Sequence, residues 1–119
     1  MGLTQEIGRR GENEAVDFLK KKKYKIIGRN FRTSKFGEID IIAEDNNQLI
    51  FVEVKAKTNY NFGAPEEEFT RYKKKKMRRA IQDYFWAKKL ETENWRIDLI
   101  AVDFLRDRTE IRQHTIYQD

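Results

Sequence analysis

Two segments of the chain carry apolar residues every three to four positions, which is the spacing of an amphipathic helix. We predict one helix over residues 4–22 and a second over residues 70–90. The apolar stripe of the first comprises Ile7, Gly11, Ala15, Phe18 and Leu19, and that of the second Met77, Ala80, Ile81, Tyr84, Ala87 and Leu90. Lysines gather at the end of the first helix, where the helix dipole favours positive charge.

Runs of apolar and β-branched residues predict five strands around these helices. The first covers residues 24–32, and two more, joined by a turn, occupy residues 36–57. An apolar strand at residues 95–104 fits burial on both faces, and residues 110–117 form a last strand at an edge. The order αβββαβ, with one extra C-terminal strand, favours an α/β fold with a mixed central sheet flanked by helices.

Charged residues interrupt the paired strands of residues 36–57, although their neighbours are suited to burial. Because side chains alternate along a strand, Glu38, Asp40 and Ile42 should share one face, with Ile39, Ile41 and Ala43 on the other. The turn centres on two asparagines at residues 46 and 47, a residue type that tolerates positive φ. A hairpin symmetric about that centre pairs Asp40 with Glu53, and Glu38 with Lys55.

Two carboxylates facing each other in this way repel strongly. With Cβ atoms roughly 5 Å apart, the repulsion is about 3 kcal/mol at an effective dielectric near 20. A divalent cation such as Mg²⁺ or Mn²⁺ turns that repulsion into chelation, because hard oxygen ligands suit it. Lys55 can reach a phosphate or polarise an attacking water, so Asp40, Glu53 and Lys55 favour phosphodiester hydrolysis.

A second interpretation of the same hairpin stays open. Asp40 can be an ordinary edge charge, with Glu53 neutralised by Lys55 or Lys57 in a surface ion-pair ladder. A β-bulge would also break the assumed register.

Composition excludes several classes of protein. The 119 residues suit one domain, which we assign to residues 1–119, and an apolar fraction of 39% is enough for a core. No cysteine is present, which excludes a disulfide framework, and the single His114 excludes a site built from several imidazoles. No apolar run approaches the ~20 residues of a membrane span and no signal-peptide core is present, so we expect a cytoplasmic protein without a membrane partner.

Positive charge is concentrated at one place. The formal net charge is +5, and seven of the nine residues from Arg71 to Arg79 are basic. Because this run begins the second predicted helix, where the dipole favours anions, it can bind phosphates. The alternative is a solvated helix face.

The spacing of Asp40, twelve residues and then Glu53-x-Lys55 resembles the PD-(D/E)xK signature of restriction-endonuclease-like nucleases. The match extends to an ordered set of blocks that closely resembles the YraN family of small bacterial proteins, distant relatives of Holliday-junction resolvases. These blocks are "GRRGENEAVDFL", "GRNFR", "GEIDIIAED", "FVEVKAK", "FGAPEEEFTRYKKKKM" and "WRIDLIAV". The proline of the signature is replaced here by Ile39.

The resemblance implies a restriction-endonuclease-like αβββαβ core and a role for each matching residue. Asp40 and Glu53 would be metal ligands and Lys55 the catalytic lysine. Glu12 would be a third catalytic and metal-binding carboxylate, although helical periodicity does not choose between it and Glu14. Lys73 matches a lysine of a family block and Lys57 stands where relatives often carry Arg, so both are expected to contact DNA. Lys74 and Arg78, from the same basic run as Lys73, are further candidates.

Other residues are expected to shape the protein rather than react. Asp98 should cap a segment or pair with a buried arginine, and Trp86 and Trp95 should lie in the core or at an interface. Phe62, Gly63 and Pro65 should shape a loop near the mouth of the site, and His114 should lie on the surface of an edge strand.

These inferences lead to one hypothesis and one alternative. The hypothesis is a Mg²⁺- or Mn²⁺-dependent endonuclease that acts on DNA with branched, flapped or single-stranded parts, compatible with a homodimer. The alternative is a non-catalytic nucleic-acid-binding or adaptor protein that keeps the nuclease fold.

Overall fold

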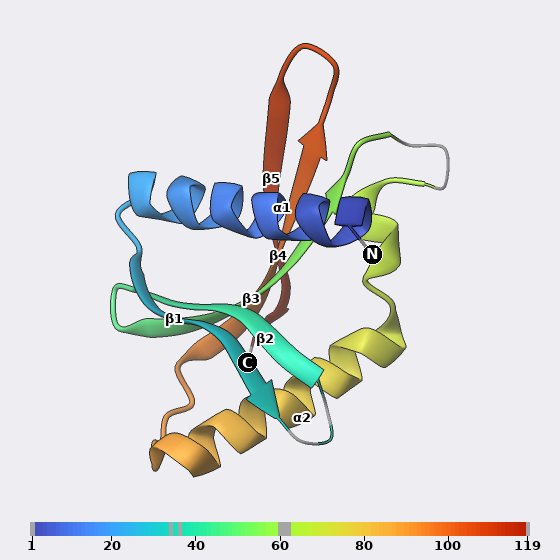
Figure 1. Cartoon of the computed structure of the whole chain (residues 1–119). Coiled ribbons are helices and arrows are strands. Elements are labelled where there is room, and N and C mark those ends of the chain that lie inside the picture. The colour runs from blue at the N-terminus through green and yellow to red at the C-terminus, as the bar shows by residue number, and fades with distance from the viewer. Residues whose placement is uncertain (1, 34, 36, 60–62, 119) are drawn as a thin grey trace.

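The computed structural model describes residues 2–33, 35, 37–59 and 63–118, and it contains a five-stranded mixed sheet with one long helix on each face (Figure 1). In chain order the elements are α1 (Gly2–Lys21), β1 (Lys25–Thr33), β2 (Gly37–Asp45), β3 (Gln48–Lys57), the 3₁₀ helix η1 (Pro65–Glu68), α2 (Arg71–Lys88), β4 (Trp95–Phe104) and β5 (Thr109–Gln118). The predicted order of helices and strands is confirmed. Neither helix in this part of the chain is long and apolar enough to cross a membrane.

The strands lie side by side in chain order, β1-β2-β3-β4-β5. All neighbours are antiparallel except β3 and β4, which are parallel. A parallel pair needs a long crossover, and η1 and α2 supply it. As predicted, β4 is buried on both faces and β5 lies at an edge.

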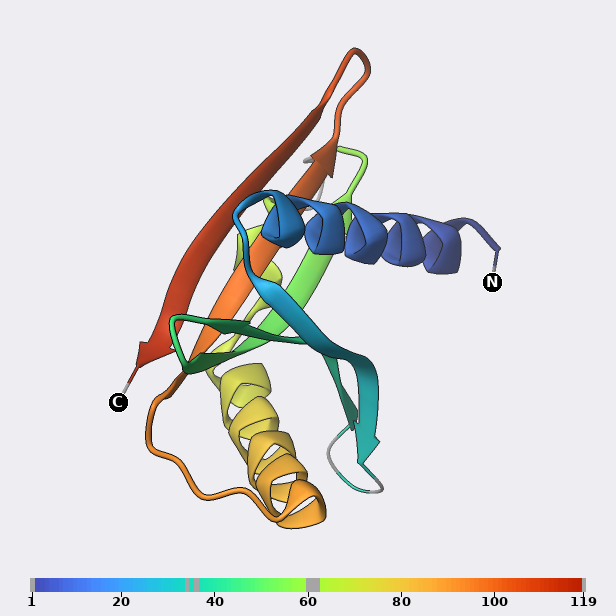
Figure 2. The same ribbon diagram turned by 90° about the vertical axis from the view of Figure 1, so that its left-hand side faces the viewer.

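Each helix covers one face of the sheet (Figure 2). Each also closes its own apolar core. The α1 side is aliphatic and is built around Leu19, Ile50 and Val102. The α2 side is aromatic, with Phe51 in edge-to-face contact with Tyr84 at 5.5 Å between ring centroids. The predicted apolar stripe of α2 is too long at its end, because Ala87 and Leu90 are exposed.

The turn between β2 and β3 forms as the sequence predicts. Asn46 and Asn47 have φ values of 49° and 66°, the left-handed conformations that a two-residue hairpin turn requires. The register is confirmed from the pair Asp45–Gln48 to the pair Ile41–Val52.

The ladder between β2 and β3 ends there, one pair short of Asp40 and Glu53. The predicted strand pair Asp40–Glu53 is therefore wrong as a ladder pair, and the predicted alternation of β2 also fails at this point. Ile39 packs in the core on the α2 side, whereas Ile41 packs on the α1 side.

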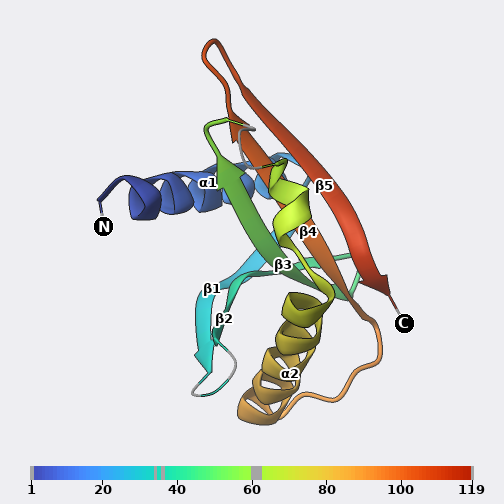
Figure 3. The same ribbon diagram turned by 90° about the vertical axis from the view of Figure 1, so that its right-hand side faces the viewer.

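A bend in the neighbouring strand accounts for the change. Asn30 has φ 54° and lies in β1 between the residues that pair with Ile39 and Ile41. Figure 3 shows the far end of the β1–β2 hairpin parting from β3 and running toward α2. This parting of the two strands opens the sheet beside Asp40.

Most residues expected to be structural behave as predicted. Asp98 is fully buried, and its carboxylate accepts from Arg96 Nε at 3.0 Å, Gln113 Nε2 at 2.7 Å and Thr115 Oγ1 at 2.9 Å. Trp95 packs in the aromatic core, but Trp86 is 87% exposed, so a core position for Trp86 is wrong. Of the predicted loop residues, Pro65 is buried and Gly63 adopts φ 93°, while Phe62 lies outside the described residues.

Candidate active site

Asp40 and Glu53 meet where β2 parts from β3. The backbone N–H of Val54 donates to Asp40 Oδ2 at 2.8 Å, so the carboxylate takes the place of a strand hydrogen bond that the ladder no longer provides. The Asp40 side chain also hydrogen-bonds the Glu53 side chain. Both acids are thus held together by the local geometry of two strands, although not as a ladder pair.

Burial governs the protonation of this pair. Desolvation, reinforced by the charge of Glu53, raises the pKa of Asp40 to about 9. Burial also raises the pKa of Glu53, while a hydrogen bond from Asp40 and the charge of Lys55 oppose that rise. The two carboxyl groups therefore share a proton at neutral pH, with Asp40 donating to Glu53.

Lysines approach the acid pair from the α2 side. Lys55 Nζ lies 3.9 Å from Glu53 Oε1 on the same strand. Lys73 and Lys76 of α2 line a cavity of about 170 Å³ together with Glu38, Glu53 and Lys55, which we call the lysine cavity. Burial and the charge of Lys55 lower the pKa of Lys73, as expected where cations are crowded.

Helix α1 contributes Glu12 from the other face of the sheet. Glu12 lines a cavity of about 680 Å³ with Asp40, Glu53 and Lys55, which we call the acid cavity, and its charge helps to raise the pKa of Asp40. Glu14, the alternative from the sequence, does not line this cavity. The structure thus brings Glu12, rather than Glu14, to the acid pair.

Arg29 holds Glu12 in place. Its Nη2 lies 3.0 Å from Glu12 Oε1 and 2.7 Å from Asn13 Oδ1. Arg29 also lines the acid cavity, and sequence analysis assigned it no role. The "GRNFR" block contained it, but nothing in one strand indicates which helix residue lies across from it.

Helix α1 comes close enough to β3 for this arrangement because of a glycine. A methyl group on Gly11 would overlap the methyl group of Ala56. With no side chain at position 11, the helix rests directly on β3, and the next residue, Glu12, reaches the edge of the acid cavity.

The donor set suits a hard divalent cation only in part. Two buried carboxylates with a shared proton offer oxygen ligands whose mutual repulsion a cation would relieve. In the described ranges, however, no group of three or more His, Cys, Asp or Glu side chains is placed to hold a metal ion. The expected third ligand, Glu12, is turned to Arg29.

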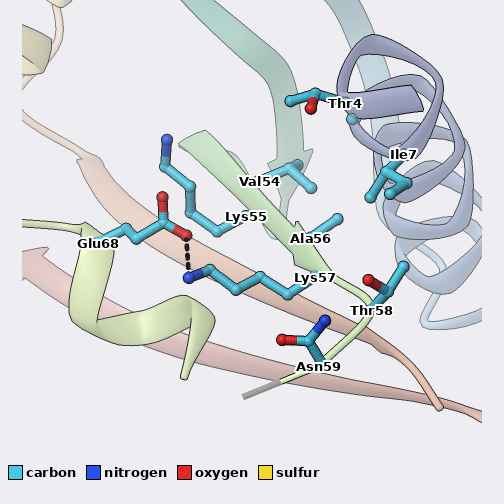
Figure 4. A pocket seen from close by; sticks show the side chains of 10 residues that line it. Thr4, Ile7, Val54, Lys55, Ala56, Lys57, Thr58, Asn59 and Glu68 are labelled. Atoms are coloured by element: carbon cyan, nitrogen blue, oxygen red, sulfur yellow. Dashed lines mark ion pairs between the residues drawn. The ribbon is translucent and has the colours of Figure 1, made fainter. Parts of the chain in front are cut away.

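The residues predicted to contact DNA are not all near the acid pair. Lys73 lines the lysine cavity, whereas Lys57 pairs with Glu68 at 3.0 Å in a third cavity of about 390 Å³, which adjoins the other two at Lys55. Figure 4 shows Lys55 and Lys57 extending from β3 toward the side where η1 presents Glu68. Lys74 lines neither the acid cavity nor the lysine cavity, and the Arg78 guanidinium stacks on the Tyr117 ring at 4.5 Å.

The fold and this site define a class of protein. It is a small mixed α/β protein in which the buried acids Asp40 and Glu53 lie between Glu12 of α1 and the lysines of the lysine cavity. The chain belongs to the family described as "Uncharacterised protein family UPF0102", whose model matches residues 11–102. That match includes every residue of the acid pair and the lysine cavity.

Relatives of similar length share much of the sequence. A UPF0102 protein of Caldicellulosiruptor saccharolyticus is 41% identical over 98 residues, which cover 82% of each chain. One from Persephonella marina is 41% identical over 80% of this chain and 81% of its own. A third, from Alkaliphilus oremlandii, is 38% identical over 92% of this chain and 94% of its own.

Proposed function

We propose that this protein is a metal-dependent endonuclease of the restriction-endonuclease-like, PD-(D/E)xK class that hydrolyses phosphodiester bonds in DNA. The observation that supports it best is the buried pair of Asp40 and Glu53 with Lys55 beside it. Burying two acids together costs stability, and a sheet needs no such pair to form. The resemblance to the YraN family, a distant relative of Holliday-junction resolvases, points to the same chemistry.

In this proposal Asp40 and Glu53 hold one Mg²⁺ or Mn²⁺ ion. The bound ion would lower the pKa of a water molecule and neutralise charge on the phosphate. Binding requires the acid pair to lose its shared proton, so metal affinity should rise with pH. Glu12 would join through a water molecule, or directly after release from Arg29.

The lysines orient the substrate around that centre. The Lys55 ammonium, 3.9 Å from Glu53, would hold the attacking water or an oxygen of the scissile phosphate. The water oxygen would form a new bond to phosphorus and give up a proton to solvent, the bond to the leaving oxygen would break, and that oxygen would take up a proton. Lys73 would hold an adjacent phosphate through the lysine cavity.

The proposed substrate is DNA with branched, flapped or single-stranded parts, cleaved by a homodimer when two strands are cut. The test is incubation with branched, flapped, single-stranded and duplex DNA in Mn²⁺, Mg²⁺ or chelator. We expect cleavage with a metal ion and none in chelator. Cleavage that persists in chelator would contradict the metal mechanism.

Asp40→Asn is the decisive variant. It should abolish Mn²⁺-dependent cleavage, because an amide cannot serve as an anionic metal ligand, while leaving DNA affinity equal or higher, because it adds no negative charge to the site. Asp45→Asn, at the other end of β2 beside the turn, is the matched control and should cleave normally.

A second candidate function is a nucleic-acid-binding or adaptor protein without catalysis. The pairing of Glu12 with Arg29 favours it, because the third carboxylate is already neutralised. In that case no DNA in the panel is cut and Asp40→Asn changes nothing, whereas substitution of Lys73 weakens salt-dependent DNA binding.

A further inference from the structure

We propose that a pocket around Tyr72 binds an unpaired base of the substrate strand and so selects DNA with single-stranded parts. The Tyr72 pocket has a volume of about 310 Å³ and is lined by Lys35, Tyr72, Lys75, Lys76 and Arg79. This inference rests on the proposed function and names what the same site would recognise.

The pocket is built mainly from one face of α2. Residues 72, 75, 76 and 79 follow the i, i+3, i+4, i+7 spacing, so the aromatic ring and three cations form one stripe along the helix. Lys35, from the segment between β1 and β2, adds a cation from outside the helix. The apolar stripe of α2, which includes Met77 and Ile81, faces the core instead.

Tyr72 presents its ring to solvent among positively charged side chains. Its side chain is 71% exposed, although a tyrosine ring offers a large apolar face. A ring that stands among cations is the combination with which proteins bind single strands, because bases stack on the ring and cations hold the phosphates.

The charges around the ring are not explained by helix stability. The first turn of α2 carries no acidic residue, and basic side chains near a helix N-terminus oppose the dipole. Among the residues with described positions, no carboxylate pairs with Lys75 or Lys76. These two lysines are therefore available to phosphates.

The Tyr72 pocket adjoins the candidate active site through Lys76. Lys76 lines both this pocket and the lysine cavity, where Lys55 and Glu53 also lie. A strand whose base stacks on Tyr72 would pass its neighbouring phosphate along Lys76 toward Lys73 and Lys55. The site would thus read an unpaired nucleotide beside the bond that is cut.

Duplex DNA cannot make the stacking contact without losing a base pair. In a duplex both faces of each base are covered by neighbouring bases, and exposing one costs a few kcal/mol. An unpaired base in a flap or at a junction offers its face freely. We therefore expect the protein to prefer DNA with unpaired bases over duplex DNA, and we expect this preference to depend on the Tyr72 ring rather than on the surrounding charges.

The test measures binding without cleavage, in chelator, by fluorescence anisotropy with a duplex that carries a single-stranded flap and a fully paired duplex of the same sequence. Tyr72→Ala should weaken flap binding about tenfold, the effect of losing one stacked base, and change duplex binding less than twofold. Tyr72→Phe keeps the ring and should bind the flap like the wild-type chain.

Trp86→Ala is the matched control. Trp86 is the other large exposed aromatic residue of α2, but its surroundings include Glu91 as well as Lys89. It should bind both DNAs normally. Lys75→Ala should weaken the binding of both DNAs alike. It should also reduce the salt dependence of the binding affinity by about the amount of one phosphate contact.

If Tyr72→Ala loses the same affinity for the flap and for the duplex, or loses affinity for neither, the inference is overturned. Because no metal ion is present, this outcome is independent of cleavage. A flap preference that depends on the ring in a protein that never cuts DNA would support the Tyr72 pocket and contradict the endonuclease.

Discussion

Asp40 serves the sheet and the candidate site with the same carboxyl group. One oxygen accepts from the Val54 N–H at 2.8 Å, and the group also hydrogen-bonds Glu53. An asparagine can make both contacts, because its amide oxygen accepts and its NH₂ group donates. Asp40→Asn therefore separates charge from shape at this position.

We predict that Asp40→Asn stabilises the folded protein in chelator. The pKa of Asp40 is about 9 in the folded state, against an ordinary value of 3.8, so the folded state holds a proton that the unfolded chain has lost. The contribution of Asp40 to the free energy of unfolding should therefore be highest below about pH 4 and fall as pH rises toward 9. At pH 8 the variant should gain at least about 1 kcal/mol.

Thermal unfolding between pH 4 and pH 9 measures this effect. The difference in melting temperature between the variant and the wild-type chain should grow with pH. It should shrink when Mn²⁺ is added to the wild-type chain, because a bound ion stabilises the folded state. A variant that is less stable at every pH would contradict the assignment of a buried, protonated acid.

Glu66 of η1 shows the opposite shift, a lowered pKa. Its carboxylate accepts from Arg112 Nε at 2.6 Å and lies 2.9 Å from His114 Nε2, which joins η1 to β5. His114 is on the edge strand and 45% exposed, as the sequence predicts. The hydrogen bond from Arg112 lowers the pKa of Glu66 to about 2.

We predict that Glu66→Gln loses about 1–2 kcal/mol of stability at pH 7, because a charge-assisted but partly exposed pair is removed. The folded pKa of Glu66 lies below its ordinary 4.5, so the wild-type contribution is complete above about pH 4.5 and is lost as pH falls toward 2. Urea unfolding at pH 7 and pH 3 measures it. The free energy of unfolding of Glu66→Gln should fall less between pH 7 and pH 3 than that of the wild-type chain. The exposed control Glu91→Gln should behave like the wild-type chain.

At the scale of elements, the position of α1 depends on its contact with β3 at Gly11. We predict that Gly11→Ala destabilises the protein by about 1–3 kcal/mol, because the added methyl overlaps Ala56 and the helix must move. Gly8→Ala is the control, since nothing lies within 4 Å of the added carbon. It should stabilise the helix by about 0.5–1 kcal/mol.

Chemical denaturation of both variants distinguishes a packing contact from helix propensity. If Gly11→Ala gains stability as Gly8→Ala does, then α1 does not rest on β3 in the manner described.

The elements themselves could be predicted because each depends on a local pattern. The apolar period of α1 and the paired asparagines of the β2–β3 turn lie within short stretches of chain. The parting of β2 from β3 could not be predicted, because it depends on the left-handed conformation of Asn30 in a different strand. Alternation therefore placed Ile39 on the wrong face.

At the scale of the whole molecule, the candidate site draws on α1, three strands and α2. Asp40, Glu53 and Lys55 could be predicted because one hairpin carries all three residues. Arg29 reaches them only through tertiary packing, so its part in the site was not predicted, and Lys76 was predicted only as one residue of the basic run from Arg71 to Arg79. Resemblance to a family supplied Glu12, and the packing of Gly11 on Ala56 gives the physical reason for its position.

The bond from Val54 to Asp40 has a consequence for how this protein could change over evolution. A descendant without the proposed activity would still need an oxygen at position 40 to accept the hydrogen bond from the Val54 N–H of the neighbouring strand. Aspartate would thus be retained at position 40 after the activity was lost, and asparagine is the substitution that would be tolerated best there. An aspartate at this position in a relative is therefore weak evidence that the relative is an enzyme. Loss of the lysine at position 55 would be the earlier sign that catalysis had been lost.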